Sequence, residues 1–392
     1  YDANEFKPTI ETQAKEAAGI NLAIKGELAW SLMPLGININ QVEILDQDLQ
    51  LFASIKQLLA QVELASIFTG RPKVETILVD ELKLNLIQKS ETLSNWTNIL
   101  PPSTDSSDTT KKNHEAEEVT TEAVKPEKQK SKLEFLVNNL EIKNTALSFR
   151  SIPMNQDISL SNINLTLTDI ALDKNIPISV SFNFKDTINE LKISSTLSSS
   201  IQVSSDFSQI QINQLQSNYK INAPTILPDF KGETLDISFN TQLKINTQTE
   251  TVNIEQFSSQ IAHLKVQGKS LIQHYNKDLE IEGEIDIPPF SLKNQLTELG
   301  IKLPSMQSKT ALDSTGVKTS FSLYKDQFSL RGIDIQLDES HWRGTLDIGL
   351  KDQAIKANLK GDQLNVDHYL PPAATNKTED IPPEQESATT GD

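Results

Sequence analysis

The sequence contains no cysteine among its 392 residues. This absence excludes disulfide bonds, thiolate catalysis and cysteine-ligated metal sites. A chain of this length without cysteine is typical of a compartment in which stray thiols would be oxidised, such as the bacterial periplasm. Glycine is also scarce, with 14 residues, so we expect few left-handed turns and no glycine-rich loop that cradles a phosphate.

Long apolar runs are absent as well. No stretch of about 18 apolar residues occurs, so the chain as given is not expected to cross a membrane as a helix. The sequence starts at Tyr1 without a methionine or a signal peptide, which predicts that an N-terminal segment has been removed. Hydrophobic residues make up 37% of the chain, a lean content that favours sheets with one apolar face over a thick globular core.

The chain is acidic, with a formal net charge of -17. This charge argues against a nucleic-acid partner and against flat docking on an anionic membrane, because both need clustered lysine and arginine. Residues 371–392 contribute -4 and residues 101–132 contribute -1, which leaves -12 for the rest. The acidity therefore belongs to the folded parts too, where we interpret it as a contribution to solubility.

Two segments have the composition of disordered chain. Residues 101–132 are rich in Ser, Thr, Glu and Lys and have almost no aliphatic side chains, so ordering them would cost entropy without burial. The acidic tail at 371–392 has the same character. The sequence thus predicts an N-terminal region at 1–100, a linker at 101–132, a main region at 133–370 and a disordered tail.

The N-terminal region begins with a helical pattern. Apolar residues from Phe6 to Ala14 recur at helical spacing, and Gly19 stands where a helix-ending glycine is expected. The period then changes to two over residues 22–28, which predicts a strand. Residues 51–64 fit either a helix or a strand.

The main region is dominated by strict alternation of apolar and polar residues, which predicts strands with one apolar face each. Phase slips at 160–163 and 330–333 predict bulges or short turns, and residues 291–299, closed by Gly300, look helical. The apolar members of the four clearest segments are Ile178, Val180, Phe182 and Phe184; Leu235, Ile237, Phe239, Leu243 and Ile245; Leu279, Ile281, Ile285 and Ile287; and Leu346, Ile348 and Leu350.

A sheet with one apolar face must bury that face against something. A single short helix in 133–370 cannot cover ten or more strands. Two arrangements therefore remain open: the sheet folds on itself as a sandwich or barrel, or it curls into a trough that holds a ligand.

No pattern of catalytic or metal-binding residues stands out. The five histidines, His114, His263, His274, His341 and His368, lack the spacing of metal ligands. No nucleophile elbow or phosphate-binding loop occurs, so we expect no enzyme activity, cofactor or metal. We interpret Trp30 and Trp96 as core residues.

Several stretches carry a family resemblance. The opening helix leads into Gly26–Pro34, and strands follow up to Ser94-Asn95-Trp96; later, Pro289–Leu292 leads to Leu299-Gly300-Ile301, and the alternation ends at Asp367–Pro371. In their order and spacing, these stretches resemble the AsmA family of bacterial envelope proteins. The resemblance covers most of residues 1–370.

The resemblance implies a fold and a function. AsmA-like proteins are anchored in the inner membrane by one N-terminal helix, lie in the periplasm, and belong with the bridge-like lipid-transfer proteins. It implies a mainly β protein whose extended, curved antiparallel sheet forms an apolar-lined trough, with a short N-terminal helix and few other helices. The sixteen apolar residues named above would then line a groove for phospholipid acyl chains. The membrane anchor before Tyr1 and a further β-rich part after Asp392 would be missing here.

The implied role is outer-membrane biogenesis, with phospholipids moving between the inner and outer membranes along the groove. The inward positions contain no basic cluster, which predicts little preference for a head group. A first alternative is an envelope scaffold that assists outer-membrane protein assembly through contacts with other envelope proteins, with edge strands pairing by strand addition. A second is a polysaccharide hydrolase, which needs paired carboxylates in a cleft; the acids here alternate onto the outer faces instead.

Overall fold

The structure is a computed structural model that describes residues 2–32, 34–46, 48–63, 66, 73–97 and 137–372. The predicted linker at 101–132 lies outside these ranges. Of the predicted tail at 371–392, only residues 371 and 372 are described. The division into four regions stays a prediction.

Short helices mark the two ends of the chain and one point between them. They are η1 (Ala3–Phe6), α1 (Lys7–Ala18), α3 (Leu292–Glu298) and η2 (Val366–Tyr369). The predicted N-terminal helix is confirmed, because α1 ends at Gly19, whose φ of 68° is the left-handed conformation that glycine adopts without strain. The predicted helix at 291–299 is confirmed as α3, which Ser291 caps by accepting the Asn294 amide.

All strands of the described residues belong to one sheet. Its N-terminal strands are β1 (Asn21–Ile24), β2 (Leu28–Leu32), β3 (Leu35–Leu45), β4 (Leu51–Val62), β5 (Val74–Asp80) and β6 (Lys83–Gln88). The central strands are β7 (Val137–Ser151), β8 (Gln156–Leu167), β9 (Asn175–Asp186), β10 (Leu191–Val203), β11 (Gln209–Asn222), β12 (Leu235–Asn246) and β13 (Thr251–Ile261). The C-terminal strands are β14 (Leu264–Gln273), β15 (Glu280–Phe290), β16 (Thr315–Tyr324), β17 (Gln327–Leu337), β18 (Ser340–Gly349) and β19 (Ile355–Gly361). The stretch 51–64, which the sequence left open, is thus a strand up to Val62.

Most consecutive strands are antiparallel neighbours; the exceptions are β1 and β2, β5 and β6, and β6 and β7. β1 and β2 both pair with β3, and β5 and β6 both pair with β4 on one side and β7 on the other, so nineteen strands occupy seventeen positions. The pairings of β5 and β6 with β7 are parallel, whereas all other pairings in the described chain are antiparallel. A parallel neighbour requires a long return connection, and residues 89–136 between β6 and β7 supply one.

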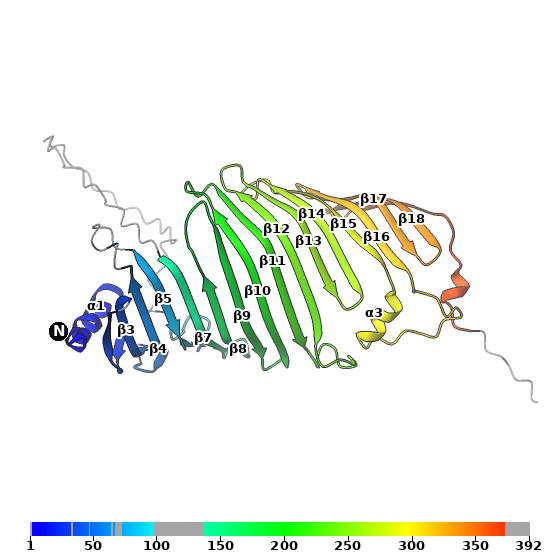
Figure 1. Cartoon of the computed structure of the whole chain (residues 1–392). Helices are drawn as coiled ribbons and strands as arrows, with labels where there is room; N and C mark the ends of the chain where they lie inside the picture. Colours follow the sequence, from blue (N-terminus) through cyan, green and yellow to red (C-terminus); the bar gives the residue numbers. More distant parts are fainter. Residues whose placement is uncertain are drawn as a thin grey trace, which may run out of the picture.

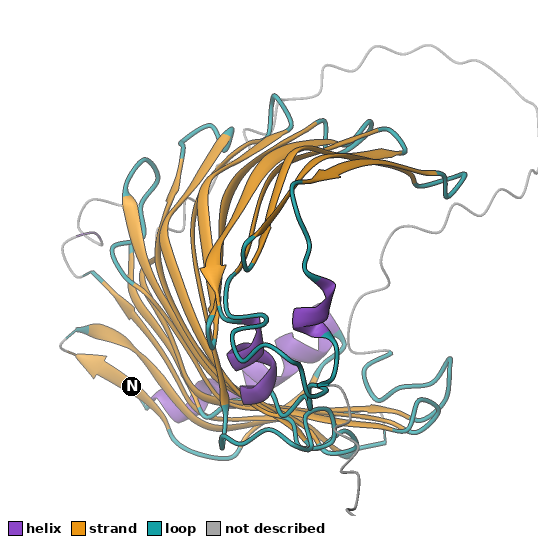
Figure 2. Cartoon of the chain, turned by 90° about the vertical axis from the view of Figure 1, so that its right-hand side faces the viewer, coloured by secondary structure: helices purple, strands orange, loops and turns teal. Residues whose placement is uncertain are grey.

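The sheet is a single curved layer. Figure 1 shows the strands side by side along the long axis, from α1 at one end to β18 at the other. Viewed along that axis, the sheet has a C-shaped cross-section (Figure 2). A sandwich would place a second sheet over the first, and the described strands form one sheet only. Of the two arrangements that the sequence left open, the structure therefore has the curved, extended sheet and not the sandwich.

Bulges occur at the two places, 160–163 and 330–333, where the alternation of apolar and polar residues shifts by one residue. The register between β8 and β9 shifts between Ser161 and Asn164, and the register between β17 and β18 shifts between Leu330 and Ile333. Gly332, within the second shift, has a φ of 60°. Each extra residue bends its strand and strengthens the local twist, so these positions contribute to the curvature.

A small conventional core lies at the N-terminal end. Ala3 of η1 packs with Ile24, Leu28 and Val42, all less than 9% exposed, and Ile10 of α1 adds to this cluster. The helices thereby cover the first strands. The strand predicted over residues 22–28 is interrupted, because β1 ends at Ile24 and β2 begins at Leu28. In this break, a Cβ on Gly26 would lie 2.6 Å from the Asn40 carbonyl oxygen.

Trp30 also differs from expectation. It is 45% exposed and meets Phe6 edge to face, with ring centroids 6.3 Å apart, so it covers the end of the sheet rather than filling a core. Trp96, by contrast, is half-buried beside Phe149.

Candidate functional site

Fourteen of the sixteen predicted groove residues lie within strands β9, β12, β15 and β18. The other two do not. Leu279 precedes β15 and is 39% exposed, and Leu350 lies in the turn after β18 and is 55% exposed. Alternation alone extended both strands by one residue, because it does not show where the ladder of backbone hydrogen bonds stops.

The strand register aligns apolar residues of neighbouring strands into rows that cross the sheet. The first row runs over ten strands from β10 to β19: Val203, Ile210, Ile245, Val252, Ile272, Ile281, Leu323, Phe328, Ile348 and Ile355. The second runs from β1 to β12: Leu22, Ile44, Ala53, Leu84, Leu147, Leu160, Phe184, Ile193, Ile221 and Leu235.

A third row crosses the parallel junction between β5 and β7. It consists of Leu28, Ile39, Leu58, Val79, Ile142, Leu165, Val180, Leu197, Ser217 and Phe239. All three rows meet on β12, where Leu235, Phe239 and Ile245 have the same parity and so point to the same side. We call the side that carries these rows the apolar face. The register thus places the predicted residues of β9, β12, β15 and β18 together.

Residues of the apolar face are partly shielded, yet few are buried. On β10, Ile193 and Leu197 are half-buried, whereas their neighbours Lys192, Ser194 and Thr196 are exposed. In the first row none is buried, and Ile355 is 71% exposed. Apart from the cover that η1 and α1 give the first strands, no described element forms a second layer over this face.

Small hydroxyl residues on the apolar face do not interrupt it. Ser217, Thr241 and Ser270 are only 2%, 6% and 8% exposed. Their hydroxyls donate to backbone carbonyls of the next strand, at 3.2 Å to Phe239, 2.9 Å to Gln256 and 2.9 Å to Glu282. Because the backbone carbonyls satisfy these buried hydroxyls, the three residues present no free polar group on the apolar face.

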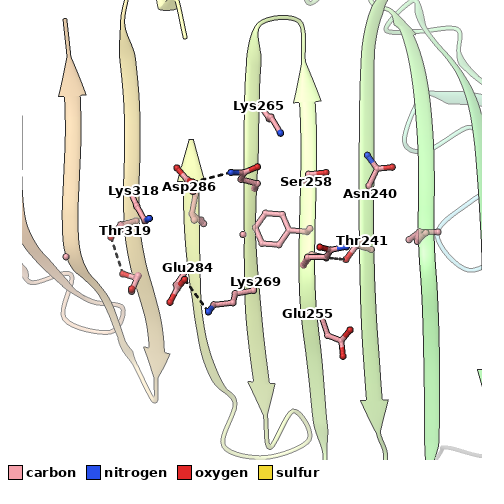
Figure 3. A pocket seen from close by; sticks show the side chains of 18 of the residues that line it. Asn240, Thr241, Glu255, Ser258, Lys265, Lys269, Glu284, Asp286, Lys318 and Thr319 are labelled. Carbon is pink, nitrogen blue, oxygen red and sulfur yellow. Dashed lines mark hydrogen bonds and ion pairs between the residues drawn. The ribbon is translucent and has the colours of Figure 1, made fainter. Parts of the chain in front are cut away.

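The opposite face is polar and carries a pocket of about 1000 Å³ that extends from β11 to β17 (Figure 3). Some polar side chains of the lining pair with one another: Lys269 lies 3.4 Å from Glu284, and Gln267 donates to Asp286 at 3.2 Å. This pocket was not foreseen from the sequence. The lining holds three lysines and four carboxylates, so it has no excess of positive charge that would attract an anion, and such a mixed lining is typical of a solvated face.

The histidines of the described chain pair singly with carboxylates. The nearest contacts are 3.0 Å from His263 to Glu298 and 3.1 Å from His368 to Glu339. Among the described residues, no group of three potential ligands could hold a metal ion; His114 lies outside them.

A segment along one long edge of the sheet was only partly foreseen. We call residues 291–314, which include α3, the rim segment. The side chain of Gln295, 4% exposed, accepts hydrogen bonds from the amides of His263 (2.8 Å) and Leu264 (2.9 Å) in the β13–β14 turn. Gly300, with a φ of 81°, passes so close to Asp229 that a Cβ would lie 2.2 Å from its carbonyl carbon.

The end of the rim segment meets the turn between β17 and β18. The Asp338 carboxylate accepts the amides of Leu312 (2.8 Å) and Ser314 (3.0 Å) and the Tyr369 hydroxyl (2.8 Å). Burial opposes ionisation of Asp338, but these hydrogen bonds outweigh it and hold its pKa below the ordinary value. Burial and the hydrogen bond to Asp338 raise the pKa of Tyr369 to about 12. The tyrosine thus links η2 to the sheet.

The curved single-layer sheet, with apolar rows along one of its faces, defines the class of the chain as an extended, mainly β protein. The AsmA family profile matches residues 1–392, the whole chain, and the chain belongs to this family. Its members are envelope proteins, and the family is not a known enzyme family. Neither a curated protein nor a solved structure matches the chain. None of the helices in the described ranges is long and apolar enough to cross a membrane.

Proposed function

We propose that this protein binds phospholipid acyl chains on its apolar face and moves phospholipids between the inner and outer membranes of a Gram-negative bacterium. In this proposal the protein works in the periplasm at the inner membrane, without catalysis. Membership of the AsmA family fits a role in outer-membrane biogenesis. The transport of lipid along the sheet is our inference.

One observation carries the proposal: three rows of mainly apolar residues, each crossing ten strands, are mostly half-exposed, and no element of the described residues covers them over most of their length. Exposed apolar surface of this extent marks a binding site in a soluble protein. The apolar side chains are less exposed than their polar neighbours, which supports placing them on the concave side, where side chains converge. We assign the groove to that side.

The dimensions suit an acyl chain. At about 4.8 Å between strands, the first row extends over about 43 Å. One leaflet of a bilayer core is about 15 Å thick, so an acyl chain would cover about three strands. Each methylene group sheltered from water contributes about 0.8 kcal/mol, and a row without gaps lets a chain slide from strand to strand at nearly constant free energy.

Photocrosslinking in intact cells tests the proposal. A photoreactive residue at Phe239 or Ile285, on the apolar face, should capture phospholipid, whereas the same residue at Asn240 or Glu284, on the polar face, should not. Folding of each variant is checked by its thermal transition. Capture of protein alone, or of nothing, at both apolar positions of folded variants would remove the lipid proposal.

A scaffold function is the second candidate, and the last strand favours it. β19 pairs only with β18 in the described sheet, and all seven of its residues are exposed. A free edge can accept a strand from another protein. Crosslinking to other envelope proteins from Lys356 or Lys360, without lipid capture at Phe239, would favour this function.

A further inference from the structure

Four lysines that are scattered in the sequence meet at the rim segment. Lys293, Lys302 and Lys309 belong to the rim segment itself, and Lys231 belongs to the connection between β11 and β12. Together they line a pocket of about 620 Å³. Its position beside the lower ends of the strands follows from α3 in Figure 1, and Figure 2 places α3 inside the curve of the sheet.

The pocket is cationic although the chain carries a net charge of -17. Asp229 is the one carboxylate in the lining, against four lysines. It lies 3.6 Å from Lys302, and the Lys293 ammonium donates to the Lys309 carbonyl at 2.6 Å. Neither Lys231 nor Lys309 forms an ion pair with a carboxylate of the described residues. Two ammonium groups therefore remain available to an anion.

The backbone holds these lysines in place. Gly300 allows the rim segment to approach Asp229 to a distance that any side chain would block. Buried Gln295 fixes α3 to the β13–β14 turn. Both sides of the pocket, the connection at 229–231 and the segment at 300–309, are thus positioned by contacts that do not involve the lysine side chains.

The rest of the lining is apolar or carries hydroxyl groups. Ile301, which is 48% exposed, lines the pocket together with half-buried Leu303 and Met306. Free phosphate has no hydrocarbon part that these aliphatic side chains could contact. A ligand with a phosphate and hydrocarbon chains matches both parts of the lining, because ammonium groups bind phosphate and aliphatic side chains shelter methylene groups.

We infer that this pocket binds the anionic head group of a phospholipid at the rim, while its acyl chains reach the apolar face. The inference rests on the proposed function and adds a preference for anionic lipid. The sequence analysis predicted little head-group preference, because it considered only the inward positions of the strands; the lysines come from the rim and are separated by up to 78 residues.

The test compares binding of labelled phosphatidylglycerol and phosphatidylethanolamine by the full chain. The double variant Lys231→Gln/Lys309→Gln removes two charges without orphaning a carboxylate. Each lysine near an anionic lipid is worth about 1 kcal/mol, or about fivefold in affinity. The affinity for phosphatidylglycerol should therefore fall about 25-fold, whereas that for phosphatidylethanolamine should change little. The control variant Lys265→Gln/Lys318→Gln, from the polar-face pocket, should behave as the wild type.

The outcomes separate the two proposals. If the wild type binds neither lipid, the proposed function fails and the pocket inference fails with it. If the wild type binds both lipids equally, or the double variant keeps the preference, the pocket inference alone is wrong. Inorganic phosphate is the third probe: binding as tight as that of phosphatidylglycerol would assign the pocket to a free anion and overturn the inference.

Discussion

Replacing Ile245 by aspartate tests the apolar face most directly. Ile245 is the third of the ten residues of the first row, between Ile210 on β11 and Val252 on β13. The change places a carboxylate where an acyl chain would rest. Asn246→Asp is the matched control, because Asn246 is the next residue of the same strand and points to the opposite face. The Asn246 side chain accepts hydrogen bonds from two turn amides, and an aspartate carboxylate can accept the same two bonds.

The size of the effect follows from the geometry. A chain of about 15 methylene groups, about half sheltered by an open face, gains about 6 kcal/mol at about 0.8 kcal/mol per group. It lies over about three strands, so losing the contact at one strand costs about 2 kcal/mol, or about thirtyfold in local occupancy. Since Ile245 is only half-buried, the new carboxylate stays hydrated, and the protein should fold.

The assay is lipid capture by a photoreactive residue at Val252, at lipid concentrations below saturation. Capture should fall about thirtyfold with Ile245→Asp and stay unchanged with Asn246→Asp. A second photoreactive residue at Phe184, in the second row, should capture as before in both variants. Two results would refute the reasoning: unfolding of Ile245→Asp, which would mean that the face is a covered core, or full capture at Val252 in a folded variant.

Three further predictions concern the rim segment and the contact of η2 with the sheet. Gly300→Ala should destabilise it by about 1–3 kcal/mol, because alanine is strained at positive φ and its Cβ would meet the Asp229 backbone; an unchanged thermal transition together with an unchanged phosphatidylglycerol preference would contradict this. Gln295→Ala leaves two turn amides without an acceptor and should cost about 2 kcal/mol, seen as faster hydrogen exchange at residues 262–264 than in the wild type. Tyr369, with its pKa raised to about 12, contributes stability that is complete below about pH 10 and is lost as the pH rises towards 12. Tyr369→Phe should lower the free energy of unfolding by about 1 kcal/mol, because it removes the hydrogen bond to Asp338, and it should abolish the latest step of the ultraviolet tyrosine titration. If a late step survives in this variant, that step belongs to another tyrosine and the assignment is wrong.

The strands and their apolar sides could be predicted from the sequence because alternation is a local property. Consecutive side chains of any extended segment point to opposite sides, so the pattern from Ile178 to Phe184 already assigns one face of β9. The same reasoning gave the bulges near Ser161 and Gly332, where one extra residue shifts the phase. Residues 51–64 were undecidable locally, because their apolar positions fit both periods; pairing of β4 with β3 and β5 decided for the strand.

Other features could be found only from the tertiary structure, because they depend on which distant segments of the chain come into contact. The alignment of Ile245 with Ile281 and Ile348 into one row is set by register across successive hairpins, and no single strand contains that information. The parallel pairing of β5 with β7, the curvature of the layer and the joining of all described strands into one sheet likewise depend on contacts between distant segments. The lysine pocket is the clearest case: Lys231 and Lys309 carry no motif, and they meet because Gly300 lets the rim segment pass close to the connection between β11 and β12.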